Sequence, residues 1–184
     1  MGLLSERERA ERFLQWADEH AVGAEARYNR FGEGSGLPVM SLWYQDTPEP
    51  GWGVGLTYGL SLLPHSGSEL LVVVRSEDPV WVWALADFVD RNRTDGYQLG
   101  AGHAIRFGAP ISGDSPMDAF FITRATSVLG GDDVVHLDTD DHIRLLQAVP
   151  IRSSEVPLLR QLGVAAFAAR AGETLLDPRR EPLA

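Results

Sequence analysis

The densest group of side chains that could perform chemistry lies between residues 132 and 142. It reads Asp132-Asp-Val-Val-His136-Leu-Asp138-Thr-Asp140-Asp-His142. If this segment folds as a hairpin, His136 and Asp138 share a face and His142 lies across from them, so nitrogen and oxygen ligands could meet at a divalent metal. The spacing matches no named metal motif, and the other interpretation is an acidic turn in contact with solvent. We predict no metal site, and we keep as the alternative function a small metal-dependent hydrolase or ligand-binding domain that uses His136, Asp138 and His142.

A second candidate is His103, which follows a glycine-rich turn, Gly96-Tyr-Gln-Leu-Gly-Ala-Gly102. A histidine at such a turn could act as a general base. No serine or cysteine nucleophile elbow and no orienting carboxylate lies near it in the sequence, which favours a structural histidine bonded to the backbone.

Other catalytic motifs are missing from the sequence. There is no Gly-x-Ser-x-Gly, no dinucleotide-binding fingerprint and no His-Glu-x-x-His. The chain also has no cysteine and no lysine, which excludes thiolate nucleophiles, cysteine-bound zinc, Schiff-base chemistry and a P-loop lysine. We predict a protein that is not an enzyme, with no catalytic residue and no cofactor.

Charge and hydropathy restrict the partners. The formal net charge is −10, which argues against nucleic acid because phosphate binding needs a basic surface. It favours a basic protein partner, although an acidic surface that only maintains solubility fits equally well. No apolar stretch approaches the roughly 18 residues that span a bilayer, and the N-terminus is charged rather than signal-like. We expect a cytoplasmic protein with no membrane partner.

Helical and strand patterns predict the elements that would position these residues. Ser5 and Glu8 have capping-box spacing at the start of a helix that reaches His20, and three glycines make 31–36 a loop. Strands are predicted at 39–44, 53–60, 69–75, 104–107, 118–126, 134–137 and 142–149, with turns at 112–116 and 130–133.

The strand at 53–60 has an unusual face. Its apolar residues alternate with the small residues Gly53, Gly55, Thr57 and Gly59. Such a face lets another backbone approach closely. This face of the strand would form a groove for a peptide or ligand, or it would pack closely against another part of the chain. Close internal packing is the commoner reason for glycines in strands.

The tryptophan-rich helix Val80–Val89 supplies the candidate partner-binding residues. Its apolar stripe consists of Trp81, Leu85, Phe88 and Val89. Trp83 instead shares its spacing with Asp87 and Asp90, which predicts a partly exposed tryptophan beside carboxylates. We predict that Trp83, Asp87 and Asp90 bind a partner, since tryptophan is enriched at interface hot spots. The alternative is a Trp83 packed under a neighbouring loop.

The C-terminal third ends in helix. Ser153 or Ser154 can cap a last helix, and Gly163 stops or kinks it before a second short helix at 165–171. Two prolines make 177–184 a predicted flexible tail. The predicted organisation is therefore an N-terminal helix that packs on the core (1–30), one domain (37–176) and this tail.

The order of several segments resembles the Suppressor of Fused-like domain family. The resemblance extends roughly from Gly51 to Leu176. The matching segments are Gly59-Leu-Ser61, Glu69-Leu-Leu-Val-Val-Val, the helix with Trp83 and Leu85, Gly102-His-Ala-Ile105, Pro110-Ile111, Asp118-Ala-Phe-Phe-Ile122, Val149-Pro-Ile151, Glu155 and Gly163.

This resemblance implies a single α/β domain of the α+β type, with a mixed, largely antiparallel sheet flanked by helices and no catalytic activity. In animals, the family member sequesters transcription factors by clamping a peptide as an added strand. Bacterial stand-alone relatives look like immunity proteins of polymorphic toxin systems. We expect a protein of the second kind, which neutralises a basic cognate toxin by direct binding. A third possibility is a structural regulator that adds a partner strand along an exposed sheet edge.

Overall fold

The computed structural model describes residues 4–21, 25–32, 38–63, 66–92, 98–125 and 133–183. Most of the predicted loop at 31–36, the first two residues of the glycine turn 96–102 and residues 130–132 of the turn at 130–133 lie outside these residues. The described α-helices are α1 (Glu6–His20), α2 (Val80–Asn92), α3 (Val156–Leu162) and α4 (Val164–Ala171). Short 3-10 turns occur at η1 (Leu60–Leu62), η3 (Ser153–Glu155) and η4 (Gly172–Thr174).

The described strands form one eight-stranded mixed sheet. The strands are β1 (Ala26–Phe31), β2 (Val39–Gln45), β3 (Gly53–Tyr58), β4 (Ser68–Val74), β5 (Ala104–Arg106), β6 (Ala119–Arg124), β7 (Val134–His136) and β8 (His142–Ile151). Their order is β1-β2-β3-β4-β8-β6-β5, with β7 also paired to β8. The β4–β8 pair is parallel and the other described pairs are antiparallel. The predicted fold class is therefore confirmed.

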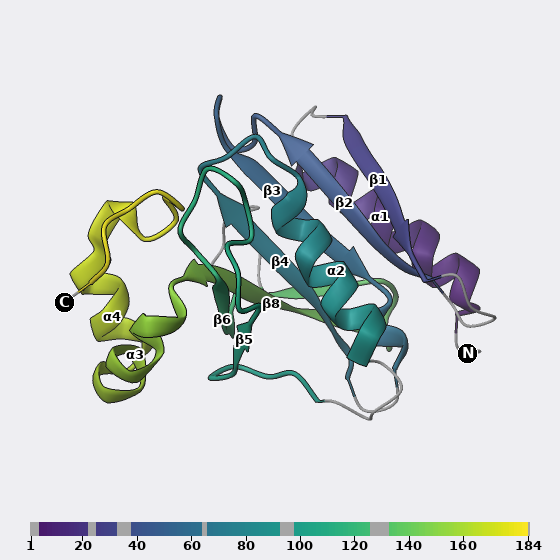
Figure 1. Cartoon of the computed structure of the whole chain (residues 1–184). Helices are drawn as coiled ribbons and strands as arrows, with labels where there is room; N and C mark the ends of the chain where they lie inside the picture. Colours follow the sequence, from purple (N-terminus) through teal and green to yellow (C-terminus); the bar gives the residue numbers. More distant parts are fainter. Residues whose placement is uncertain are drawn as a thin grey trace.

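Helices cover both faces of the sheet, as Figure 1 shows. On one face, α2 packs over β2, β3 and β4, and its apolar stripe joins a core that reaches Ile105 and Phe120. On the other face, Phe13 and Ala17 of α1 are fully buried in a second core. A third cluster joins the end of β8 to α3 and α4. In a strand that is covered on both faces, the side chains that point to either face are buried. Strands β3 and β4 are accordingly buried along their whole length.

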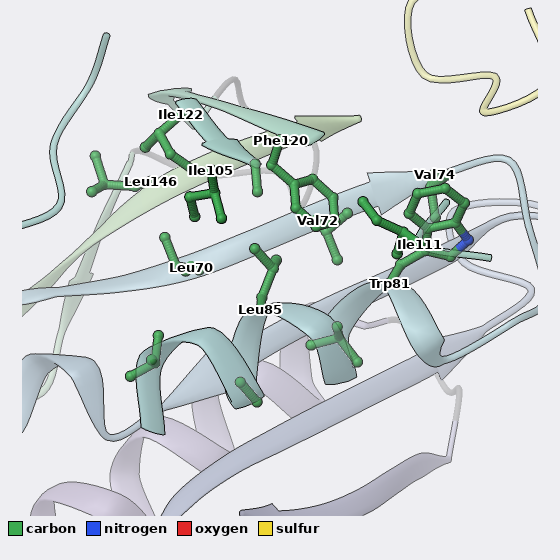
Figure 2. Packing of buried hydrophobic residues seen from close by; sticks show 14 of the residues in the cluster. Leu70, Val72, Val74, Trp81, Leu85, Ile105, Ile111, Phe120, Ile122 and Leu146 are labelled. Carbon is green, nitrogen blue, oxygen red and sulfur yellow. The ribbon is translucent and has the colours of Figure 1, made fainter. Parts of the chain in front are cut away.

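The small face of β3 lies beneath α2. A Cβ atom built on Gly55 would lie 2.5 Å from the Cβ of Val82 in α2, and one on Gly53 would overlap the indole of Trp43. Figure 2 shows Leu85 pointing from α2 toward β4, where Leu70 and Val72 lie. The glycines therefore serve internal packing, and the interpretation as an open groove is wrong because helix side chains fill that space.

A buried carboxylate joins β3, β4 and η1. Glu69 has no exposed surface, and its carboxylate accepts hydrogen bonds from the Thr57 hydroxyl at 2.8 Å and from three backbone N–H groups at residues 59–61. Burial raises the pKa of Glu69, while the hydrogen bonds, chiefly from Ser61, oppose that rise. The same turn is tied to α1, because Arg9 donates to the Ser61 carbonyl and pairs with Asp141. Glu69 thus fixes the turn on which the N-terminal helix rests.

The C-terminal segment is held by a second buried charge. Arg180 and Glu155 form a two-pronged ion pair at 2.6 and 2.8 Å, and both side chains are almost fully buried. The Leu183 N–H donates to the same carboxylate, and the Ser115 hydroxyl donates to the Pro178 carbonyl. This arrangement differs from the flexible tail predicted for 177–184, because Arg180 finds its partner 25 positions away, beyond any local pattern.

Most predicted elements are present with shifted ends. The capping box of Ser5 and Glu8 is confirmed, and Gly163 ends α3 with a φ of 78°. The cap expected from Ser153 or Ser154 is formed by neither residue. The Ser153 hydroxyl donates to Asp118, and Glu155, at the end of η3, occupies the N-cap position of α3. The predicted N-terminal segment 1–30 also contains most of β1, a strand that the sequence analysis does not include.

Adding a methyl group at Gly55 should separate α2 from the sheet. We expect Gly55→Ala to lower the free energy of unfolding by about 1–3 kcal/mol, because the stem of Val82 cannot move away without the helix. Urea unfolding followed by circular dichroism measures this change. Gly113→Ala is the matched control, since nothing lies within 4 Å of a Cβ atom added at that position. Equal stability of the two variants would contradict the packing assignment.

Removing the buried cation should destabilise the domain in a pH-dependent way. Burial alone would raise the pKa of Glu155, but hydrogen bonds from Arg180, Leu183 and Arg152 outweigh it and hold the pKa below its ordinary 4.5. The stabilisation is therefore complete above about pH 4.5 and is lost as the pH falls through the lower folded pKa. We expect Arg180→Met to cost about 3–5 kcal/mol at pH 7, because Glu155 would remain buried without its cation.

The measurement is urea unfolding of the parent and of Arg180→Met at pH 7 and at several values below 4.5. Arg179→Met is the control, because the neighbouring Arg179 side chain is 56% exposed and its loss should change stability by less than about 0.5 kcal/mol. A difference between parent and Arg180→Met that stays constant with pH would refute the role of Glu155 ionisation.

Candidate protein-binding surface

Helix α2 is fixed at its start and along its inner face. The Asp78 carboxylate accepts a hydrogen bond from the Val80 N–H, which satisfies one of the free donors at the helix start. The inner face is buried against the sheet and consists of Trp81, Val82, Leu85, Ala86 and Val89. This placement leaves one face of α2 directed outward, as seen in Figure 1.

The outer face carries Trp83, Asp87 and Arg91 at successive four-residue intervals. Trp83 is 39% exposed, so the interpretation in which a neighbouring loop buries it does not hold. Asp87 pairs with Arg91 at 2.9 Å, and Arg91 thus partly neutralises the carboxylate that helical spacing assigns to a basic partner. Asp90 is half-buried and lies next to this row on the helix. We call Trp83, Asp87, Asp90 and Arg91 the outer α2 face.

The predicted residues are thus brought together on one helix, but Arg91 belongs with them. Its position could have been found from the sequence, because Asp and Arg four residues apart on a helix commonly pair. The exposed pair adds little to stability, with exposed ion pairs contributing about 0–1 kcal/mol. It leaves an apolar ring beside a mixed-charge row rather than an acidic patch.

The start of α2 also borders a polar cleft of about 430 Å³. Four separate parts of the chain line it, with residues Pro50, Gly51, Arg75, Ser76, Glu77, Asp78, Asp114 and Arg179. The Ser112 hydroxyl lies 2.6 Å from Asp114 and 3.0 Å from Asp78, so it can donate to only one of these carboxylates at a time. The described lining contains charges of both signs and no histidine to serve as a base.

The cluster considered for a metal does not assemble as a three-ligand site. His136 and His142 face each other across the β7–β8 pair, with ring centroids 6.4 Å apart. Asp138 instead accepts hydrogen bonds from Thr139 and pairs weakly with Arg12 of α1 at 3.9 Å. Those Thr139 hydrogen bonds lower the pKa of Asp138. Within the described residues, no three histidine, aspartate or glutamate side chains group around one point.

His103 lies on the exposed side of its turn. The Gly100 N–H points at its Nδ1 at 3.4 Å, which agrees with the interpretation as a histidine bonded to the backbone. Its strand neighbour β5 pairs with β6 at the edge of the sheet.

Comparison with known proteins extends the assignment from fold to family. The sequence model of the Suppressor of fused protein (SUFU) matches residues 35–181. No functionally curated protein has a significant sequence match to this chain. No helix of the described residues is long and apolar enough to cross a membrane.

Several solved structures share the fold. A SUFU homolog from Neisseria gonorrhoeae is 17% identical with a TM-score of 0.75, and the match covers 96% of this chain and 97% of the homolog. The Sufu–Fu complex gives 11% identity and a TM-score of 0.67, covering 94% of this chain and 91% of the other. Drosophila Suppressor of Fused is 12% identical with a TM-score of 0.56, and the match covers 78% of this chain and 42% of the larger Drosophila chain.

The family match spans β2 to the ion pair of Glu155 with Arg180, and the fold agrees over almost the whole chain. The protein therefore belongs to the Suppressor of fused (SUFU) family.

Proposed function

We propose that this protein is a non-enzymatic binding domain that docks a protein partner on the outer α2 face. The observation that carries the proposal is the exposure of Trp83 on a helix whose other large apolar side chains face the core. Burying a tryptophan removes a large apolar area from water, and tryptophan is enriched among residues whose truncation weakens interfaces most.

The helix offers this ring at a low entropic cost. Val82 and Leu85 are fully buried and fix α2 against the sheet, so docking does not have to order the backbone beneath Trp83. A rigid helix that presents one aromatic ring is therefore suited to insert the ring into a recess of a partner.

Charge favours a basic partner. The chain carries a net charge of −10, which speeds the approach of a basic protein and makes the association sensitive to salt. At contact, a cationic side chain of the partner would replace or join Arg91 at Asp87, with Asp90 close by on the same helix.

We infer further that the partner is a toxin and that the protein acts as its immunity protein by covering the toxin's functional surface. Two comparisons support this. A homolog with the same fold comes from a bacterium, and the match covers 97% of its solved chain. The Sufu–Fu complex contains a domain of the same fold in a complex with a protein. The cytoplasm is the compartment in which such a toxin would be met.

A second mode of binding is favoured by β1. Its residues 27–30 are exposed, and among the described strands it pairs only with β2, which leaves one edge of its backbone open. A partner strand added there would use backbone hydrogen bonds rather than Trp83. This mode fits a regulator whose partner is an endogenous protein.

Truncating Trp83 should greatly reduce partner capture without unfolding the domain. We expect Trp83→Ala to retain at least tenfold less partner than the parent protein in capture from native lysate, because the main apolar anchor is lost. Captured proteins are quantified by mass spectrometry at low and moderate salt. A basic partner should be retained in a smaller amount at the higher salt concentration. Circular dichroism checks that the variant is folded.

Tyr28→Ala is the matched control, since Tyr28 is 52% exposed but lies on the α1 side of β1, where it bonds Asp18. It should bind as the parent does. Capture unchanged by Trp83→Ala would remove the outer α2 face from the proposal and favour β1. The captured protein is then expressed alone, and growth arrest that the parent relieves but Trp83→Ala does not would support the immunity role. A captured protein that is harmless would contradict it.

A further inference from the structure

The β7–β8 hairpin holds two histidines in direct register. His136 and His142 are Cα partners in the antiparallel ladder. The Leu137 N–H donates to the Asp141 carbonyl at 2.9 Å, so the 137/141 pair is of the hydrogen-bonded kind. The neighbouring pair, His136 and His142, is then a non-hydrogen-bonded pair, the kind in which facing side chains come closest. The backbone therefore fixes both imidazoles on the same side of the hairpin.

The two rings are available to a ligand. Both side chains are exposed, and their ring centroids lie 6.4 Å apart with an interplanar angle of 44°, which is too far for direct hydrogen bonding and poorly aligned for stacking. No hydrogen bond to another described residue holds either ring. Val135 and Ile143, which alternate with them, are fully buried and anchor the hairpin to the core.

This geometry suits a cation between the rings. Metal–imidazole bonds are about 2.0–2.1 Å, so one ion can join ring nitrogens up to about 4.2 Å apart. Rings with centroids 6.4 Å apart can bring nitrogens to that separation by rotating their side chains, without moving the strands. Imidazole is a preferred ligand of Zn²⁺, Ni²⁺ and Cu²⁺, and a poor one for Mg²⁺ and Ca²⁺.

We propose that His136 and His142 form a two-histidine site for a divalent transition-metal cation. Asp138 is outside this site, because it is directed to Thr139 and Arg12. The site has no catalytic carboxylate, and two protein ligands leave the other coordination positions to water or to a donor from a partner. The site is independent of the outer α2 face and of the function proposed for that face.

The test is a titration of untagged protein with NiCl₂ or ZnCl₂ by isothermal calorimetry. One ion should bind per chain, and His136→Ala and His142→Ala should each weaken binding by at least tenfold. His103→Ala should leave the affinity unchanged, because His103 is an exposed histidine that does not belong to the pair. Asp138→Ala should also leave it unchanged. Circular dichroism shows whether each variant is folded.

A second measurement keeps the proposal testable if an alanine variant fails to fold. In NMR spectra of the parent, the imidazole signals of His136 and His142 should broaden together at low Ni²⁺, before those of other histidines. Absence of binding at millimolar metal would overturn the site. The site would also be overturned if His136→Ala or His142→Ala bound the metal as tightly as the parent does. An equally large loss of metal affinity in His103→Ala would overturn it as well. An equal loss in Asp138→Ala would overturn the two-ligand composition.

Discussion

The position of the outer α2 face depends on how closely α2 can approach the sheet. Gly53 and Gly55 leave no side chain between β3 and the layer above it, and Val82 and the Trp43 indole take that space. When α2 packs at this position, its apolar stripe is buried in the core and the Trp83 ring stays exposed to solvent. Two residues without side chains therefore decide where a large side chain is presented to a partner.

Buried carboxyl groups hold the parts that flank this core. Glu69 gathers backbone donors of η1, and Arg9 connects that turn to α1. Glu155 does the same for the C-terminal segment through Arg180. A buried polar or charged group costs free energy when its partners are removed, so each of these carboxyl groups specifies one arrangement of its neighbours. These two carboxyl groups are inside the protein and therefore unavailable to a basic partner.

Local patterns in the sequence predicted much of this fold. The capping box of α1, the glycine that ends α3 and the alternation in β3 each depend on a few neighbouring residues, and the structure contains all three. Strand β1 escaped prediction because its residues 27–30 are polar or exposed on both faces, so no apolar alternation marks it. The pairing of Arg180 with Glu155 and the four-segment cleft arise only when distant parts of the chain meet. For the candidate site, helical spacing placed Trp83, Asp87 and Asp90 together, but the exposure of Trp83 required the structure.

The central claim, that a partner covers the outer α2 face, is tested most directly by measuring solvent access to Trp83 in the complex. Hydroxyl-radical footprinting of the free protein and of the isolated complex, read by mass spectrometry, reports oxidation at each aromatic side chain. If the partner covers the outer α2 face, the complex protects Trp83 strongly, while Tyr28, which lies on the α1 side of β1, is oxidised as in the free protein. Equal oxidation of Trp83 in both states, with protection appearing at β1 instead, would contradict it.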